Sequence, residues 1–239
     1  MRPVDATSAA SGVPCEPEGS EAARSDRRLL AWAALVAGSA LLIVGVRLTY
    51  DLPDDLRYRY STVVFAVVVS ALQLAIVLRI AGRGDLREML ALRRPSWSWT
   101  RVAVIGVLIV AGVIVLVASL PFLQQGEDEG NGAPFDPDRA IPFALNAVVL
   151  VVISPVLEEL MFRGLGFKLL ERFGHATAIV LTGLAFGIFH GQLQQLPALA
   201  AFGVAVGYLR SRTHSVYPGI ATHALLNLVG VVLAASLST

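Results

Sequence analysis

Three short groups of polar residues in the C-terminal half of the sequence interrupt otherwise apolar stretches. They are Glu158-Glu159-Leu160-Met161-Phe162-Arg163, Phe186-Gly187-Ile188-Phe189-His190 and His223-Ala224-Leu225-Leu226-Asn227. An ionisable side chain at membrane depth costs several kcal/mol, so it needs a partner, water or a function. We therefore interpret the three groups as parts of one buried active site.

The two adjacent glutamates are predicted to have different roles. On a helix their side chains point about 100° apart. Glu159 stands four residues before Arg163, which is the favourable order for an ion pair. Glu158 remains the freer carboxylate and is the better candidate for a general base.

The histidines and the asparagine can complete a hydrolytic site. Phe186 and His190 share one helix face, as do His223 and Asn227. A glutamate and a histidine can hold and deprotonate water, and His223 with Asn227 can donate two hydrogen bonds to one developing oxyanion. Taken singly, each residue also fits a structural role, as a packed histidine, a solvated acid or an amide that links helices.

Two local signals indicate how the chain positions these groups. Gly174 is a plausible turn, and Glu158 and His190 each lie sixteen residues from it. If both arms are helical, each group sits about 24 Å from the bend, so an antiparallel hairpin brings them to the same level. Pro155 predicts a helix interruption just before the glutamates, which would place them in the first turns of a restarted helix.

Composition sets the class of protein. The chain has 239 residues, of which 55% are hydrophobic and 15% charged, and its mean hydropathy is +0.67. These values predict a polytopic membrane protein. They argue against a nucleic-acid partner, and the absence of a nucleotide-phosphate loop argues against ATP-driven work. The single Cys15 excludes an intramolecular disulfide and a cysteine metal cluster.

The apolar runs of the sequence predict an all-α fold class, a transmembrane helical bundle of about seven spans. The predicted spans are residues 29–48, 61–78, 102–120, 141–160, 176–190, 193–209 and 216–237. Residues 1–28 are predicted to form a disordered cytoplasmic tail, 29–139 accessory transmembrane helices and 140–239 the catalytic transmembrane core. Residues 124–139 form an acidic polar loop.

The basic residues predict the orientation. With the N-terminus inside, 15 of the 19 lysines and arginines lie on the cytoplasmic side. The remaining four, which lie outside, are Arg47, Arg57, Arg59 and Arg139. We therefore expect an integral membrane protein, in the plasma membrane of a prokaryote, with a cytoplasmic N-terminus and an external C-terminus.

The three motifs, in this order, resemble those of the CAAX protease and bacteriocin-processing family, also called the Abi family. The resemblance covers about residues 141–232 and includes Pro155 and the run Phe162-Arg163-Gly164. It implies a membrane-embedded, glutamate-dependent endopeptidase without a metal or other cofactor. Glu158 and His190 would activate the water, and His223 and Asn227 would stabilise the oxyanion. Glu159 and Arg163 would support the site or position the substrate.

The expected substrate is a membrane-associated protein or peptide, processed in the manner of CAAX proteins or of bacteriocin leaders. Two alternatives remain open from the residues. Glutamate and two histidines could form a three-ligand zinc site, although no His-Glu-x-x-His motif occurs. The buried polar residues could instead serve transport, partner binding or immunity without proteolysis.

Overall fold

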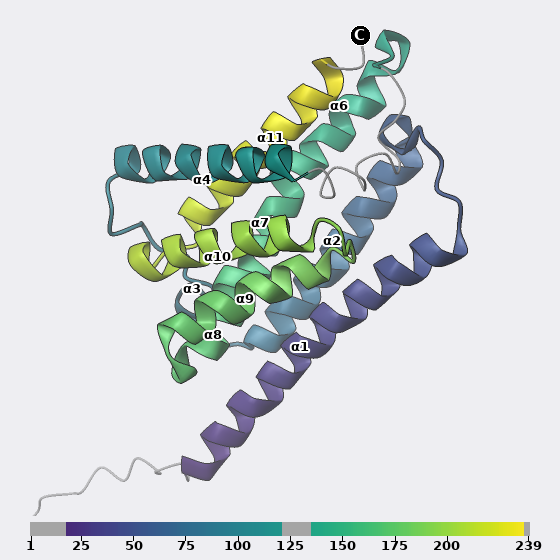
Figure 1. Cartoon of the computed structure of the whole chain (residues 1–239). Helices are drawn as coiled ribbons and strands as arrows, with labels where there is room; N and C mark the ends of the chain where they lie inside the picture. Colours follow the sequence, from purple (N-terminus) through teal and green to yellow (C-terminus); the bar gives the residue numbers. More distant parts are fainter. Residues whose placement is uncertain (1–17, 121–134, 237–239) are drawn as a thin grey trace, which may run out of the picture.

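The structure, a computed structural model, describes residues 18–120 and 135–236, and every regular element in those ranges is helical (Figure 1). This confirms the predicted all-α class. The N-terminal half contains α1 (Glu18–Thr49), α2 (Tyr60–Ala81), α3 (Leu86–Met89) and α4 (Trp99–Ser119).

Local signals account for several helix ends in this half. Gly82 follows α2 with a φ of 79°, a left-handed conformation that glycine adopts without steric cost. The side chain of Asp85 accepts hydrogen bonds from two backbone N–H groups at the start of α3. Ser98 caps α4 in the same way through the N–H of Arg101.

The predicted tail is shorter than expected, because α1 begins at Glu18 and residues 18–28 are helical. The rest of that tail, residues 1–17, lies outside the described residues, as do residues 124–134 of the predicted acidic loop. Asp55 ties the turn before α2 to the 3₁₀ turn at Pro137–Arg139, because it pairs with Arg59 and Arg139 at 2.6 and 2.8 Å. The guanidinium groups of Arg139 and Arg59 hold the pKa of Asp55 below its usual value.

One long helical stretch, residues 137–173, carries the glutamates. After a short 3₁₀ turn it runs through α6 (Ala140–Val148), a π-helical segment (Val149–Ile153), α7 (Ser154–Glu159), a second π-helical segment (Leu160–Gly166) and α8 (Phe167–Leu170). The helix break predicted at Pro155 is wrong, because the helix is distorted there but not interrupted. The backbone widens before the proline, with the N–H of Ser154 bonded to the Val149 carbonyl, and the helix then continues. The glutamates therefore have no helix N-terminus beside them.

The C-terminal part contains α9 (His175–Phe189), α10 (Leu196–Thr213) and α11 (Tyr217–Ser236). The predicted turn at Gly174 is confirmed, with a φ of 102° that favours glycine. The pair α9 and α10 packs closely at Gly183 and Gly203, where an added Cβ would meet the backbone of the other helix at 2.7 Å. In Figure 1, α4 runs across the direction shared by α1, α2 and α11. Helix α9 lies alongside α1, because Arg172 before α9 pairs with Asp26 and Gly191 after α9 lies against Val44.

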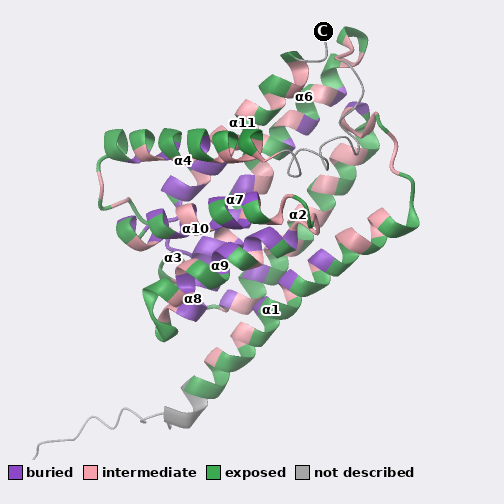
Figure 2. Ribbon diagram, viewed as in Figure 1, coloured by how far each residue is buried: buried purple, intermediate pink, exposed green. Residues whose placement is uncertain are grey.

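Five helical segments in the described ranges are long and apolar enough to cross a membrane. They are residues 22–49, 60–81, 99–119, 137–173 and 217–236. The predicted count of about seven is not reached, because α9 has only 15 residues and α10 ends in Arg210 and Arg212. Large apolar side chains on α1, α2 and α4 are exposed (Figure 2), as expected for helices whose outer faces contact lipid.

The core surrounds the second π-helical segment. Met161, Phe162 and Leu165 are fully buried there, and Trp32 of α1 and Val77 of α2 pack in the same cluster. The buried faces of the helices thus converge on the stretch that carries the glutamates (Figure 2).

Candidate active site

Glu159 and Arg163 form a fully buried ion pair at the centre of the bundle. Nη1 of Arg163 donates to Oε1 of Glu159 at 3.0 Å, and both side chains are 0% exposed. Nη2 of Arg163 donates to the Gly203 carbonyl at 2.8 Å, and its guanidinium carbon lies 4.7 Å from the centre of the Phe186 ring. The structure confirms the predicted pair. Two of its buried atoms, Oε2 of Glu159 and Nε of Arg163, have no hydrogen-bond partner among the described residues.

Helix α11 approaches this pair through Gly219. A Cβ at Gly219 would collide with Oε2 of Glu159 and would lie 2.9 Å from Val206. One turn further along α11, Nδ1 of His223 lies 3.3 Å from Oε1 of Glu159. Glycine at position 219 is therefore what lets α11 bring His223 against the glutamate.

Glu158 faces both histidines. Its Oε2 lies 3.7 Å from Nε2 of His190 and 3.9 Å from Nε2 of His223. This oxygen is buried and has no hydrogen-bond partner among the described residues. The hairpin about Gly174 thus brings the acid and His190 to the same level, as the sequence predicted.

Phe186 orients the imidazole of His190. Nδ1 of His190 lies 2.8 Å from the Phe186 carbonyl oxygen, which can only accept, so Nδ1 carries the hydrogen. In the neutral ring the lone pair is then on Nε2, the atom that faces Glu158. The Phe186 ring packs against His190 and His223, with centroid distances of 4.7 and 5.4 Å.

Asn227 lies one turn beyond His223 on α11. Its amide nitrogen donates to the Leu150 carbonyl at 2.8 Å, in the first π-helical segment. This bond ties α11 to the long helix, so one amide hydrogen is engaged in helix packing. The second amide hydrogen is left for another acceptor.

The comparisons with known proteins agree with this geometry. Residues 140–229 match the family model described as "Type II CAAX prenyl endopeptidase Rce1-like". These residues belong to the CAAX prenyl endopeptidase family. The match contains every residue predicted for the site, from Glu158 to Asn227.

A curated relative supports the same assignment. The chain is 30% identical over 108 residues to a protein of Bacillus subtilis (strain 168) named "Putative membrane peptidase YdiL". The match covers 45% of this chain and spans 43% of the relative. No solved structure matches the chain. The apolar helices and the relative's name together indicate an integral membrane protein.

Two residues that were not predicted to belong to the site support the second π-helical segment. Nε1 of Trp32 donates to the Met161 carbonyl at 3.0 Å, and Nε of Arg210 donates to the Arg163 carbonyl at 2.9 Å. Both carbonyls lie in the second π-helical segment, where the widened backbone leaves groups that need other donors. Trp32 lies outside the family match, and no spacing rule links residues 129 positions apart.

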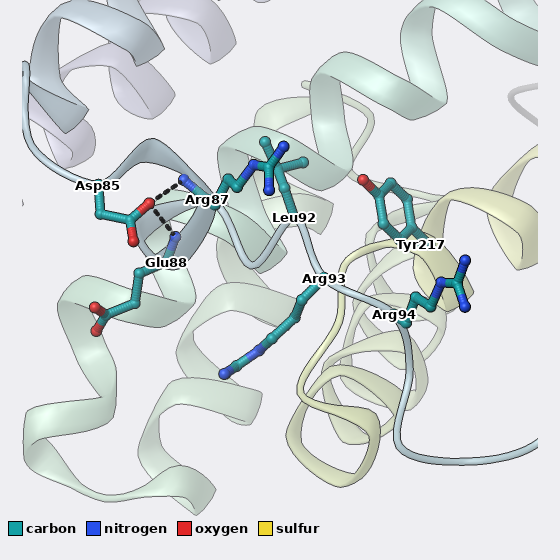
Figure 3. Close-up of a pocket in the computed structure, with 7 residues that line it drawn as sticks. All are labelled: Asp85, Arg87, Glu88, Leu92, Arg93, Arg94 and Tyr217. Carbon is teal, nitrogen blue, oxygen red and sulfur yellow. Dashed lines mark hydrogen bonds between the residues drawn. The ribbon is translucent and has the colours of Figure 1, made fainter.

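The site opens toward His190, while His223 is buried. The exposed fraction of the side chain rises from 0% in Glu159 to 12% in Glu158 and 26% in His190. A separate cavity of about 740 Å³ is lined by none of the predicted site residues; the residues that line it include Arg87, Arg94 and Tyr217 (Figure 3). Within the described ranges, no three His, Cys, Asp or Glu residues are grouped so that they could hold a metal ion.

Proposed function

We propose that the chain is an intramembrane endopeptidase that hydrolyses a peptide bond through a water molecule activated by Glu158. The observation that carries this proposal is the position of Oε2 of Glu158, which lies 3.7 and 3.9 Å from two imidazole nitrogens and has no hydrogen-bond partner among the described residues. The match of this stretch to CAAX prenyl endopeptidases supports the same chemistry.

A water molecule beside the acid and the imidazoles can bridge them. Distances of 3.7 and 3.9 Å are too long for direct hydrogen bonds, and a bridging water can satisfy both partners. Glu158 accepts one proton as the water oxygen bonds to the scissile carbonyl carbon. The same proton then passes to the leaving amine as the C–N bond breaks, with His190 orienting the water through Nε2.

His223 can stabilise the oxyanion only in one protonation state. Its Nδ1 faces Glu159, and an ionised carboxylate only accepts, so Nδ1 carries a hydrogen. Donation from Nε2 then requires a second hydrogen, which makes the ring an imidazolium. With Glu158 and Glu159 ionised and Arg163 charged, a cationic His223 makes the cluster neutral, which lowers the cost of burying it.

Asn227 is the proposed second oxyanion donor, through the amide hydrogen that does not bond Leu150. Phe186 and the pair Glu159–Arg163 position these groups. We propose a membrane-associated protein or peptide as substrate, cleaved in the manner of CAAX proteins or of leader peptides. The chain would cross the membrane about seven times, with a cytoplasmic N-terminus.

The test compares peptide termini in membranes from cells that carry the wild type, Glu158→Gln or Glu171→Gln at matched levels. Glu171 is a matched control, because it follows α8 on the same helical stretch and pairs with Lys168 away from the site. We expect one precursor to accumulate and its processed end to disappear only with Glu158→Gln. Unchanged termini together with an unchanged cellular phenotype would instead favour a binding or immunity protein.

A further inference from the structure

The long helical stretch is widened just before α7, and the widening frees one backbone carbonyl. In the first π-helical segment, the N–H of Ser154 bonds the Val149 carbonyl, five residues back. The next N–H in this pattern would serve the Leu150 carbonyl, but it would belong to Pro155, which has none. The Leu150 carbonyl is therefore left without a donor in this pattern.

Asn227 of α11 supplies the missing donor. Its amide nitrogen donates to the Leu150 carbonyl at 2.8 Å. One turn before Asn227 on α11, His223 faces Glu158, and its Nε2 lies 3.9 Å from Oε2 of that acid. Helix α11 thus meets the long helical stretch at two points, the freed carbonyl and the carboxylate.

Ser154 lies between these two points. It begins α7 and stands four residues before Glu158, so the two side chains share one helix face, about 6 Å apart along the axis. A helical carbonyl points along the axis toward the residue four positions further on, which for Leu150 is Ser154. The amide of Asn227 therefore reaches the turn where Ser154 lies. This position is where a peptide carbonyl would lie if Glu158 activated the water and Asn227 received the oxyanion.

The hydroxyl of Ser154 is available for a contact with such a peptide. The residue is half-buried, so a group that enters the site can reach it. Hydroxyls in other helices here bond a carbonyl one turn back, as Thr182 does with Ala178 and Thr213 with Leu209, both at 2.7 Å. No hydrogen bond joins the Ser154 hydroxyl to another described residue.

We propose that Ser154 is a third oxyanion donor, whose hydroxyl donates a hydrogen bond to the carbonyl oxygen of the scissile peptide bond, beside His223 and Asn227. The contact strengthens as this oxygen gains negative charge, and Ser154 forms no covalent bond. The donors would then come from both α7 and α11, so that the carbonyl is held from two sides. This inference rests on the proposed hydrolysis through Glu158.

The test uses the purified full chain and a fluorogenic peptide that spans the bond identified by comparing termini with Glu158→Gln. Ser154→Val removes the hydroxyl, whereas Ser154→Thr keeps it in a side chain of the same shape as valine. We expect Ser154→Val to lower kcat about tenfold or more, with KM changed by less than about threefold, because an oxyanion donor acts on the transition state. Ser154→Thr should retain kcat within about threefold.

Ser70→Val is the matched control. Ser70 is also half-buried in a membrane helix, α2, and its hydroxyl also has no hydrogen-bond partner among the described residues, but it lies outside the site. This variant should leave kcat and KM unchanged. An unchanged kcat in Ser154→Val, or equal losses in Ser154→Val and Ser154→Thr, would overturn the inference while cleavage still depends on Glu158. If Glu158→Gln alters no terminus, the proposed hydrolysis fails, and this inference fails with it.

Discussion

Glu158 and Glu159 are adjacent in sequence but occupy different surroundings. Glu159 is fully buried and is held by Arg163 and His223. The side chain of Glu158 is 12% exposed, and its Oε2 lies 3.7 and 3.9 Å from two imidazole nitrogens, too far for direct hydrogen bonds. Oε2 of Glu159 also lacks a hydrogen-bond partner among the described residues, so the ion pair with Arg163 is what distinguishes the two acids. Because helical rotation separates the two side chains, one acid can maintain the fold while its neighbour remains available for chemistry.

This difference predicts opposite effects of two identical substitutions. Glu159→Gln leaves Arg163 as an unpaired buried charge, so we expect a loss of about 3 to 5 kcal/mol in the free energy of unfolding. Glu158→Gln should change that free energy by less than about 1 kcal/mol and lower the cleavage rate by roughly a hundredfold or more. Unfolding in detergent, followed beside cleavage of an identified substrate, checks both. A strongly destabilised Glu158→Gln would assign the acid a structural role.

Gly219 gives a second prediction at single-residue scale. Gly219→Ala would drive a methyl group into the carboxylate of Glu159, so we expect a loss of about 1 to 3 kcal/mol in stability and a loss of activity. Gly230→Ala is the control, because Gly230 lies on the same helix with nothing within 4 Å of an added Cβ. That variant should be neutral or slightly more stable, since alanine favours a helix. Similar melting temperatures of the two variants would contradict the close approach.

Short-range spacing explains which parts of the site the sequence could predict. The ion pair of Glu159 with Arg163 follows from a separation of four residues, and the meeting of Glu158 with His190 follows from a symmetric hairpin about Gly174. Gly219 and Trp32 carry no such signal, because their partners are distant in sequence and are chosen by how the helices cross.

Side chains from two other helices support the second π-helical segment. Its carbonyls at Met161 and Arg163 are bonded by Trp32 of α1 and Arg210 of α10. The sequence predicted the positions of these helices but not the widened turns. Proline indicates that a helix is disturbed, and tertiary packing decides whether it breaks or widens.

Removal of one of these supports tests their importance. Trp32→Phe keeps an aromatic ring but leaves the buried Met161 carbonyl without a donor, so we expect about 1 to 3 kcal/mol of destabilisation. Cleavage should fall as well, because Glu159 and Arg163 flank this turn. Trp99→Phe, at a residue that is 55% exposed, is the control and should change neither property. If both variants behave like the wild type, α1 does not support the site.

For the whole molecule, the number of membrane crossings depends on α9 and α10. Both helices were predicted as spans, yet α9 has 15 residues, which reach only about 22 Å at 1.5 Å per residue. A hydrocarbon core is about 30 Å thick. Hydropathy along the chain located these apolar helices, but it could not show how they cross the bundle, which is a property of packing.

Side-specific cysteine labelling in intact cells decides between five and seven crossings. In a Cys15→Ser background, Gln194→Cys probes the connection after α9, and Arg212→Cys probes the end of α10; both positions are exposed. Seven crossings with a cytoplasmic N-terminus place position 194 outside, so an impermeant reagent should label it and leave position 212 unlabelled until the membrane is opened. If α9 and α10 enter and leave by one face, both positions respond alike.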